Sequence, residues 1–508
     1  MFLKKGEKII LIEGLIAILT FKNILYIAIA TVAGLAIGAL PGLTATMGVA
    51  IMVPFTFVMN PVTAMAVLGA LYMSAIYGGS FSAILINTPG TPGSIATAFD
   101  GYPMANKGEG EKAIIGATIA SVFGGIAGII ALLFFAPPLA NIALKFGPTE
   151  YFWLAIFGLT VISSLGRGSM LKTFLSGAFG LLVSCIGVTI MGGAIRFGFG
   201  YYKLQAGIEL ISALIGLFCI PEALKIIHER VTTYTGNINR KRSEGELTAI
   251  LYEIWNTRIT MLRSSLIGIF VGILPAAGGT IANIIAYNEA KKASKNPEKF
   301  GTGILEGVIA PEAANNATVG GGLIPTLTLG IPGTPVCAVI YGALLLQGLR
   351  PGAELFQIHG EIVYSFIWAL LISTIMMLFV GWFFGVKTYK VISRVPTRYL
   401  GPGILFLSIV GSYSIRNNSL DVVIMFIFGL LGYFFREVGL SPAAVVLGLI
   451  LGPIAEQGLV QAVLISRAMG FYKVFFGRPI SIMIILLTIF SFSWPFVSTF
   501  LKRKKKAG

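Results

Sequence analysis

Two proline–glycine motifs interrupt apolar segments of this chain. Residues 87–92 read Asn-Thr-Pro-Gly-Thr-Pro and residues 330–335 read Gly-Ile-Pro-Gly-Thr-Pro, each inside a stretch that would otherwise be taken for a membrane helix. A break at that depth leaves backbone N–H and C=O groups unpaired, which is tolerated only where they line a cavity or bind a ligand. Interrupted segments in corresponding positions of two halves indicate the substrate site of a transporter.

The composition indicates a membrane protein. Only 11% of the 508 residues are charged and the mean hydropathy is +0.87, whereas soluble domains carry about 25% charged residues. Apolar runs close to the length of a membrane span recur along the chain, at residues 25–40, 113–136, 171–195, 362–386, 422–435 and 480–500. We therefore predict an all-α polytopic integral membrane protein with about 10–12 transmembrane helices.

The net charge of +16 is concentrated in short tracts between the apolar runs. These tracts lie at the N-terminus, between residues 222 and 263, and at the C-terminus, where residues 502–506 are all basic. Positive residues in short flanking loops mark the cytoplasmic side of a membrane. We expect an inner-membrane protein with both termini cytoplasmic and an even number of crossings, and no nucleic-acid partner. Because apolar segments continue throughout, an uncleaved first span is favoured over a signal peptide.

Cysteine and histidine do not form a metal motif. Cys185, Cys219 and Cys337 lie far apart in apolar segments, and His228 and His359 are the only histidines. Buried cysteines at such positions behave as small apolar residues, and we expect no metal site with histidine or cysteine ligands.

The chain divides into five segments. We predict an interfacial N-terminal segment (1–23), a first transmembrane repeat (24–221), a cytoplasmic connecting segment (222–263), a second repeat (264–501) and a basic cytoplasmic tail (502–508). In each half a Leu-Pro pair, Leu40-Pro41 or Leu274-Pro275, is followed by small residues, a threonine and then, some 50 residues later, by Pro-Gly-Thr-Pro. This shared order predicts an internal duplication.

The sequence leaves two possibilities for the orientation of the two repeats relative to the membrane. Basic residues flank both sides of the stretch 264–287, so either this stretch enters and returns as a broken hairpin or one basic loop departs from the positive-inside tendency. Inverted repeats produce inward and outward states by exchanging the conformations of equivalent halves. We therefore predict inverted repeats, each carrying its Pro-Gly-Thr-Pro in a broken helix or re-entrant hairpin, with the two motifs meeting near the midplane.

Hydroxyl, amide and glycine residues gather at both breaks. A helix that restarts after Pro-Gly-Thr-Pro points free N–H groups and the positive end of its dipole at the break, which suits an anion. The alternative is a structural kink whose hydroxyls bond back to the helix backbone. We predict that substrate is bound by Ser80, Ser82, Asn87, Thr88, Pro89, Gly90, Thr91, Gly278, Gly279, Thr280, Pro332, Gly333 and Thr334.

The segment 306–322 adds two carboxylates and two adjacent amides beside a glycine run. Ionisable residues within a membrane are costly and are therefore expected to have a function. Side chains with oxygen atoms can bind a cation. We predict that the coupling ion is bound by Thr44, Asn87, Glu312, Asn315 and Asn316. For Glu306 a helix N-terminal carboxylate is the better interpretation, and Asp100 is expected in a solvated turn.

Several enzyme motifs are missing. The chain has no Walker-type Gly-x-x-x-x-Gly-Lys-Ser/Thr, no His-Glu-x-x-His and no Gly-x-Ser-x-Gly, which argues against an ATPase and against zinc or serine proteases. We expect a protein that is not an enzyme, has no cofactor, and takes energy from a Na⁺ or H⁺ gradient or from another chain.

The stretches 78–108, 272–288 and 300–352 resemble the large membrane subunit of the tripartite tricarboxylate transporters, the TctA family. The Pro-Glu-x-x-Asn-Asn at 311–316 and the two Pro-Gly-Thr-Pro motifs carry this resemblance, which extends over nearly the whole chain. A departure is Ala276, where family members more often have glycine, so Ala276 is a doubtful site residue.

The resemblance implies a secondary transporter that imports citrate-like or other small carboxylates with Na⁺ or H⁺. It also implies two partners, a small TctB-like membrane subunit and a TctC-like extracytoplasmic solute-binding protein. Two rival functions remain: an intramembrane enzyme that uses Glu306 and Glu312 as acid and base, and a passive anion channel lined by the two hairpins.

Overall fold

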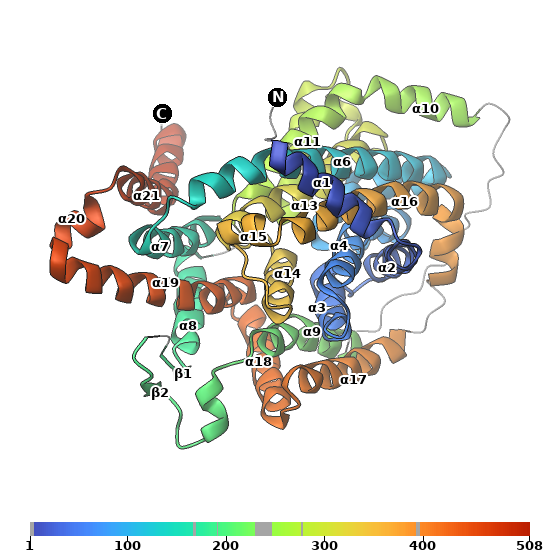
Figure 1. Ribbon diagram of the computed structural model, residues 1–508. Coiled ribbons are helices and arrows are strands. Elements are labelled where there is room, and N and C mark those ends of the chain that lie inside the picture. Colours follow the sequence, from blue (N-terminus) through green and yellow to red (C-terminus); the bar gives the residue numbers. More distant parts are fainter. Residues whose placement is uncertain are drawn as a thin grey trace. The chain divides into compact units, whose positions relative to one another are not determined.

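A computed structural model of the chain describes residues 5–165, 169–189, 191–228, 246–275, 278–392 and 397–507. Over these residues the chain forms 21 α-helices, three short 3-10 helices and one two-stranded antiparallel sheet (Figure 1). The predicted all-α fold is confirmed.

Seven of the described helices are long and apolar enough to cross a membrane. Their bounds are Phe21–Ala39, Pro61–Ile86, Gly110–Ala143, Leu210–His228, Gly360–Gly381, Ser419–Glu437 and Pro442–Met469. Shorter apolar helices lie at Ala45–Thr56, Met170–Ser184, Pro335–Leu346 and Pro479–Ser493. The protein is therefore a multi-pass membrane protein, as its composition predicted.

The chain forms two compact units. Unit 1 comprises Met1–Ala140 and Phe218–Ile415, and unit 2 comprises Asn141–Leu217 and Arg416–Gly508. Each predicted half of the chain therefore contributes its first part to unit 1 and its last part to unit 2.

Unit 1 holds both Pro-Gly-Thr-Pro motifs. From the first half it contains α1 (Lys5–Ile18), α2 (Phe21–Ala39), α3 (Ala45–Thr56), α4 (Pro61–Ile86), η1 (Pro92–Ser94), α5 (Thr97–Asn106) and most of α6 (Gly110–Ala143). Its later stretch begins within α9 (Leu210–His228) and continues with α10 (Glu246–Asn256), α11 (Arg258–Ile273), α12 (Gly278–Ala293), η3 (Pro297–Lys299), α13 (Glu306–Leu329), α14 (Pro335–Leu346), α15 (Ala353–Ile358), α16 (Gly360–Ile392) and α17 (Thr397–Arg416).

The same helix pair is built twice within unit 1. Helix α2 packs along α4, and α11 packs along α13. A Cβ added at Gly34 or Gly38 would strike the α4 backbone at Leu71 or Ala75. In the second pair, Gly268 and Gly272 face the α13 backbone in the same way. Contacts advance in the same direction along both helices of each pair, so the paired helices run parallel. Small residues permit this close approach, as they do between membrane helices generally.

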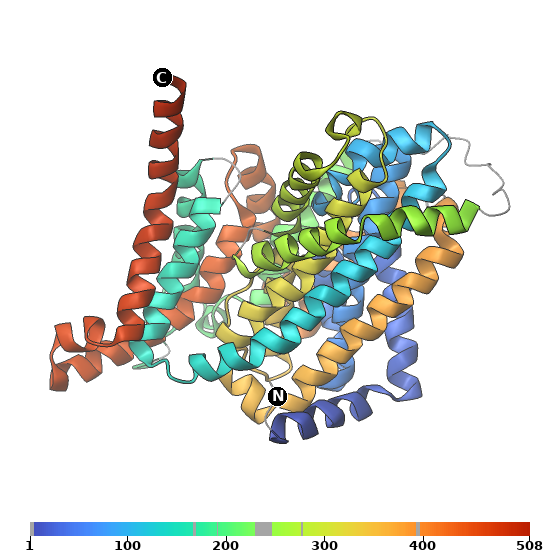
Figure 2. The same cartoon turned by 90° about the horizontal axis from the view of Figure 1, so that it is seen from above.

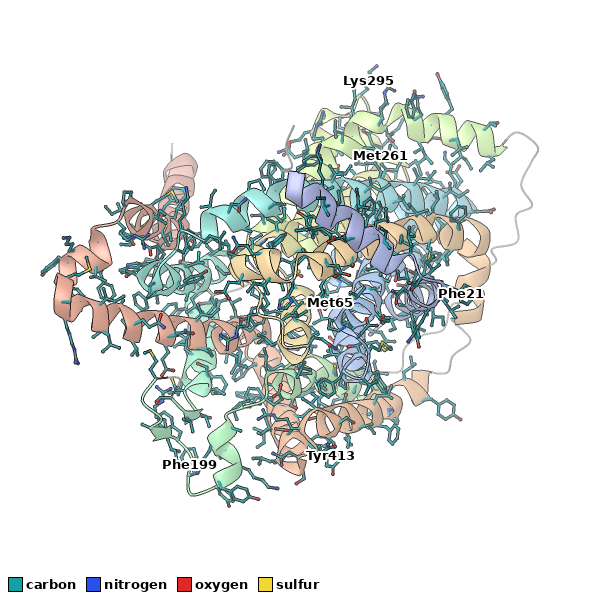
Figure 3. The ribbon with its side chains drawn as sticks, viewed as in Figure 1. Phe21, Met65, Phe199, Met261, Lys295 and Tyr413 are labelled. Carbon is teal, nitrogen blue, oxygen red and sulfur yellow. The ribbon has the colours of Figure 1, made fainter. Side chains whose placement is uncertain are left out.

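The helices around these pairs enclose a well-packed interior. Met65 of α4 is 1% exposed, whereas Phe21 at the start of α2 is 84% exposed, and Figure 3 shows both side chains. A large exposed apolar residue at the start of a spanning helix suits a lipid-facing surface.

The N-terminal segment is helical. Helix α1 packs on α16, where Ser365 Oγ donates to the Gly14 carbonyl at 2.9 Å and Trp368 Nε1 donates to the Leu11 carbonyl at 3.0 Å. It meets α2 at a bend (Figure 2). The predicted interfacial location of residues 1–23 stays a prediction.

Unit 2 is a smaller helical cluster. It contains α7 (Pro148–Leu165), α8 (Met170–Ser184), β1 (Gly187–Val188), β2 (Ile195–Arg196), η2 (Tyr202–Ala206), the start of α9, α18 (Ser419–Glu437), α19 (Pro442–Met469), α20 (Phe471–Phe476) and α21 (Pro479–Ala507). Helices α7 and α8 pack on α19, and Arg478 binds the buried Glu150 carboxylate at 2.7 Å.

The expectation of one apolar span over residues 171–195 is wrong. Helix α8 ends at Ser184 and a β-hairpin follows, with Gly187 opposite Arg196. The positive φ angles of Gly187, Gly192 and Gly193 explain the difference, because glycine adopts this conformation readily and it ends a helix. Near the hairpin, Phe199 projects outward (Figure 3) and is 75% exposed.

The predicted connecting segment 222–263 is partly helical. Helix α9 continues to His228, and α10 and α11 begin at Glu246 and Arg258. Residues 229–245, which hold Arg230, Arg240, Lys241 and Arg242, lie outside the described residues, as do Lys4 and Ala276.

We predict that Gly320→Ala destabilises the protein by about 1–3 kcal/mol, the usual cost of overpacking. A Cβ at Gly320 would strike the Gly128 carbonyl group, where α13 crosses α6. Gly403→Ala in α17 is the control, because a Cβ there meets no atom within 4 Å. Thermal unfolding in detergent should show a lower midpoint only for Gly320→Ala. Equal midpoints in both variants would contradict the tight crossing.

Candidate functional site

The first break lies where α4 stops. Asn87 takes a left-handed conformation with φ of 55°, which ends the helix. The N–H of Gly90 then turns back to the Gly79 carbonyl at 3.4 Å. The chain restarts as η1 and α5, so the helix is broken at Pro-Gly-Thr-Pro as predicted. Residues 87–96 are named tip 1.

The second break repeats this geometry. Helix α13 ends at Gly330, whose φ is 71°, two residues before Pro332, just as Asn87 stands two residues before Pro89. Helix α14 restarts with Thr334 as its N-cap, and the Cys337 N–H donates to Thr334 Oγ1 at 3.1 Å. Residues 330–337 are named tip 2.

Each tip contacts the broken helix of the other half. Tyr72 and Asn315 both lie 17 residues before the first proline of their motif. The Tyr72 hydroxyl bonds Thr334 Oγ1 of tip 2 at 3.1 Å. The Asn315 Oδ1 atom lies against Gly93 of tip 1, where a Cβ would strike it. The neighbouring helices show the same exchange between halves: η1 of the first half packs on α12 of the second, and α14 of the second half packs on α3 of the first. Figure 1 shows α14 beside α3.

Three fully buried asparagines next to tip 1 have unpaired atoms. Among the described residues, Asn283 Nδ2, both side-chain polar atoms of Asn315, and Asn316 Oδ1 have no hydrogen-bond partner. Asn283 Oδ1 accepts from the Ala96 N–H at 2.8 Å, and Asn316 Nδ2 donates to the Met73 carbonyl at 3.3 Å. A buried polar group without a partner costs about 1–3 kcal/mol. Such a cluster is the arrangement expected of a ligand site.

Glu312 lies one helical turn before Asn315 and Asn316 on α13. It is fully buried, and its oxygens accept hydrogen bonds from Thr97 Oγ1 at 2.5 Å and Ser121 Oγ at 3.0 Å. Within the described part of the chain no lysine, arginine or histidine pairs with it. Its assignment with Asn315 and Asn316 to one cation site stays a prediction.

Other predicted substrate residues surround tip 1. Asn87 and Thr88 are exposed, Pro89 is half-buried, and Gly90 and Thr91 are buried. Gly278, Gly279 and Thr280 form the half-buried first turn of α12, with Gly279 against Asn315.

Several predicted hydroxyls bond to nearby backbone groups. Ser80 Oγ donates to the Tyr77 carbonyl at 2.8 Å and Ser82 Oγ to the Gly79 carbonyl at 3.4 Å. Thr44, predicted as an ion ligand, accepts from the Met47 N–H at 3.2 Å as the N-cap of α3. In tip 2, Pro332 and Gly333 are buried, and Gly333 lies against Gly272 and Gly322.

The expectation of a solvated turn at Asp100 is wrong. Asp100 is fully buried in α5, and Oδ1 accepts from the N–H groups of Gly301, Gly303 and Ile304 at 2.8–3.0 Å. The Tyr287 hydroxyl donates to Oδ2 at 2.8 Å. These donors satisfy the carboxylate, but they lie some 200 residues away in sequence, where local patterns cannot reveal them.

Glu306 fits the interpretation as a helix-terminal carboxylate. It is the first residue of α13, is half-buried, and accepts from Thr260 Oγ1 at 2.7 Å and Ser294 Oγ at 3.0 Å.

Asn283 is the candidate residue that sequence reasoning missed. It lies four residues after Gly279, on the same face of α12. Two features of the sequence could have indicated it: its spacing from the predicted Gly278-Gly279-Thr280 turn, and the presence of an amide side chain in an apolar helix.

The sequence of the chain matches a known protein family. Residues 24–447, which include both tips and the asparagine cluster, match the family described as "Tripartite tricarboxylate transporter TctA family". The chain belongs to this family. The resemblance inferred from the sequence is thereby confirmed, and the protein is a member of a transporter family.

Two relatives come from Agrobacterium vitis. The chain is 37% identical over 470 residues to the "Uncharacterized 52.8 kDa protein in TAR-I ttuC' 3'region", which covers 91% of each chain. It is also 39% identical over 214 residues to the "Uncharacterized protein in TAR-II ttuC' 3'region", over 42% of this chain and 87% of that relative. No solved structure matches the chain.

We predict that Thr91→Val and Thr334→Val each weaken carboxylate binding roughly ten- to hundredfold, because a hydrogen bond to a charged partner contributes about 1.5–3 kcal/mol. Thr334→Val should also lower stability by about 1 kcal/mol, because it removes the N-cap of α14. Thr374→Val is the control: among the described residues, its hydroxyl donates only to the Leu370 carbonyl of its own helix. Unchanged affinity in both tip variants would mean that these hydroxyls serve only their bonds within the protein, to Ser94 from Thr91 and to Cys337 and Tyr72 from Thr334.

Proposed function

We propose that this protein is the large membrane subunit of a binding-protein-dependent tripartite system that imports tricarboxylates or other small carboxylates with Na⁺. The observation that carries the proposal is the cluster of buried, unpaired amide atoms on Asn283, Asn315 and Asn316 beside tip 1. Free amide N–H groups favour an anion that accepts hydrogen bonds, and free amide oxygens favour a cation; a carboxylate with its counter-ion meets both requirements.

The charge balance supports ion coupling. Neither 80–99 nor 323–347 contains a lysine or arginine, although a tricarboxylate carries up to three negative charges. Helix N-termini supply only about half a positive charge each, and an uncompensated buried carboxylate is very costly. A bound Na⁺, held by amide and backbone oxygens, is the simplest source of the missing charge.

A proton is the alternative coupling ion. Glu312 would carry it, since this carboxylate is fully buried and contacts only hydroxyl groups among the described side chains. Uptake would then depend on pH and be indifferent to Na⁺.

Membership of the TctA family supports two partner proteins for this chain. We infer a small TctB-like membrane subunit and a TctC-like extracytoplasmic solute-binding protein, with this chain in the cell inner membrane and both termini in the cytoplasm.

Uptake by proteoliposomes tests the proposal. With the binding protein and small subunit added, a Na⁺ gradient should drive accumulation of citrate or a related carboxylate. Dissipative flux without accumulation would indicate the channel, and no flux together with turnover of a lipid or peptide would indicate the enzyme. Uptake unchanged when choline replaces Na⁺ at fixed pH would exclude Na⁺ coupling.

We predict that Asn87→Ala and Asn315→Ala reduce the Na⁺ dependence of uptake. Each removes an oxygen that we assign to the ion, and coupling between ion and substrate is reciprocal, so citrate should also enhance Na⁺ binding less in these variants. Asn296→Ala, at an exposed loop position, should behave as the parent protein. A parent-like Na⁺ dependence in both Asn87→Ala and Asn315→Ala would contradict the assignment.

A further inference from the structure

The unpaired amide atoms beside tip 1 divide into donors and acceptors. Asn283 is oriented by its Oδ1 bond to the Ala96 N–H, which leaves Nδ2 as a free donor. Asn316 is oriented by its Nδ2 bond to Met73, which leaves Oδ1 as a free acceptor. Asn315 has both atoms unpaired, so its side-chain O and N can be exchanged without loss of a hydrogen bond. In the exchanged orientation Nδ2 takes the place of Oδ1 against Gly93 and Gly279, and Oδ1 faces away from α12.

The two donor side chains lie close together. A Cβ on Gly279 and a Cβ on Gly93 would both strike Asn315 Oδ1, so α12 and tip 1 meet at this side chain. Asn283 stands one turn after Gly279 on the same face of α12, where residues four apart are about 5–6 Å from each other. Its Oδ1 atom holds Ala96, three residues after Gly93.

The start of α12 adds a favourable field. Helix α12 has 16 residues and begins at Gly278, so its first N–H groups are unpaired within the helix and its positive dipole end lies at the asparagine cluster. A helix start of this kind favours an anion. The two free amide donors, fully buried at the same place, point to the same ligand.

We propose that Asn283 and Asn315, the latter with its amide in the exchanged orientation, together bind one carboxylate group of the substrate through their Nδ2 atoms. The coupling cation sits on the other side of Asn315, at the Oδ1 atoms of Asn315 and Asn316. This assignment rests on the proposed function and extends it by naming Asn283 and by making Asn315 a contact of both ligands.

A shared asparagine explains coupling in physical terms. Asparagine is neutral, so it cannot compensate the carboxylate charge by itself, and the carboxylate binds well only when the cation is present. The cation in turn is stabilised by the nearby anion. Each ligand raises the affinity of the other by the same factor.

The equivalent place beside tip 2, which residues of the first half of the chain form, lacks this chemistry. Met47 stands three residues after Thr44, as Asn283 stands three after Thr280, and Tyr72 occupies the position that corresponds to Asn315. The Tyr72 hydroxyl is already paired with Thr334. The duplicated backbone therefore carries this carboxylate site once, at tip 1.

Binding measurements on the purified protein in Na⁺ buffer test the proposal, with citrate as the probe and succinate as a second ligand. Asn283→Asp keeps an oxygen to accept the Ala96 N–H but replaces the donor with a negative charge. Citrate affinity should fall at least ten- to hundredfold in this variant, and the loss should be larger for citrate than for the less charged succinate. Asn283→Ala should lose affinity as well and also show a lower unfolding temperature, because the Ala96 bond is gone.

Stabilisation by Na⁺ alone separates a binding role from a structural one. Asn283→Asp should still be stabilised against unfolding by Na⁺ without citrate, whereas Asn315→Ala should lose both responses. Asn296→Ala should retain both.

Parent-like citrate affinity in Asn283→Asp, or an equal loss for citrate and succinate together with loss of the Na⁺ response, would overturn the assignment and leave the proposed function standing. A parent protein that binds neither carboxylate would overturn both.

Discussion

The unpaired polar groups inside an apolar helical protein are the constraint on which the rest of this structure depends. Water does not compensate a backbone or amide group at membrane depth, so each must find a partner or serve a ligand. The chain meets this requirement in two ways. At the two tips, left-handed residues end the helices and turn N–H groups back to nearby carbonyls. Beside tip 1, the amides of Asn283, Asn315 and Asn316 are left with unpaired atoms, and this is where the ligand is proposed.

Glycine makes that arrangement possible. Gly38 and Gly272 bring α2 and α11 against the backbones of α4 and α13, and Gly93 and Gly279 leave room for Asn315. Lipid tails are as apolar as the side chains, so the hydrophobic effect does not drive such helices together, and close van der Waals packing of small residues does. Glycine therefore serves two purposes at different positions: it permits the helix packing, and it lets the Asn315 amide reach tip 1.

Three acidic residues of unit 1 are stabilised by neutral donors. Asp100, Glu306 and Glu312 bind hydroxyl or backbone N–H donors, and no ion pair involves them among the described residues. Neutral donors distribute the stabilisation of a carboxylate over several partners. Two of these three carboxylates, Asp100 and Glu312, tie α5 to the second half of the chain, and so they position tip 1 relative to α13.

The sequence by itself determined the membrane class, the two breaks, the family and most of the polar residues at the tips, because hydropathy and Pro-Gly-Thr-Pro are local signals. It did not reveal that Gly187–Val188 pairs with Ile195–Arg196, that Asp100 is buried, or that Asn283 lies beside tip 1. The last two outcomes depend on groups far apart in the chain: Asp100 meets Gly301, and Asn283 meets Ala96. Only the tertiary structure decided them, because an amide or carboxylate reads the same in sequence whether its partner is water, a distant N–H group or a ligand.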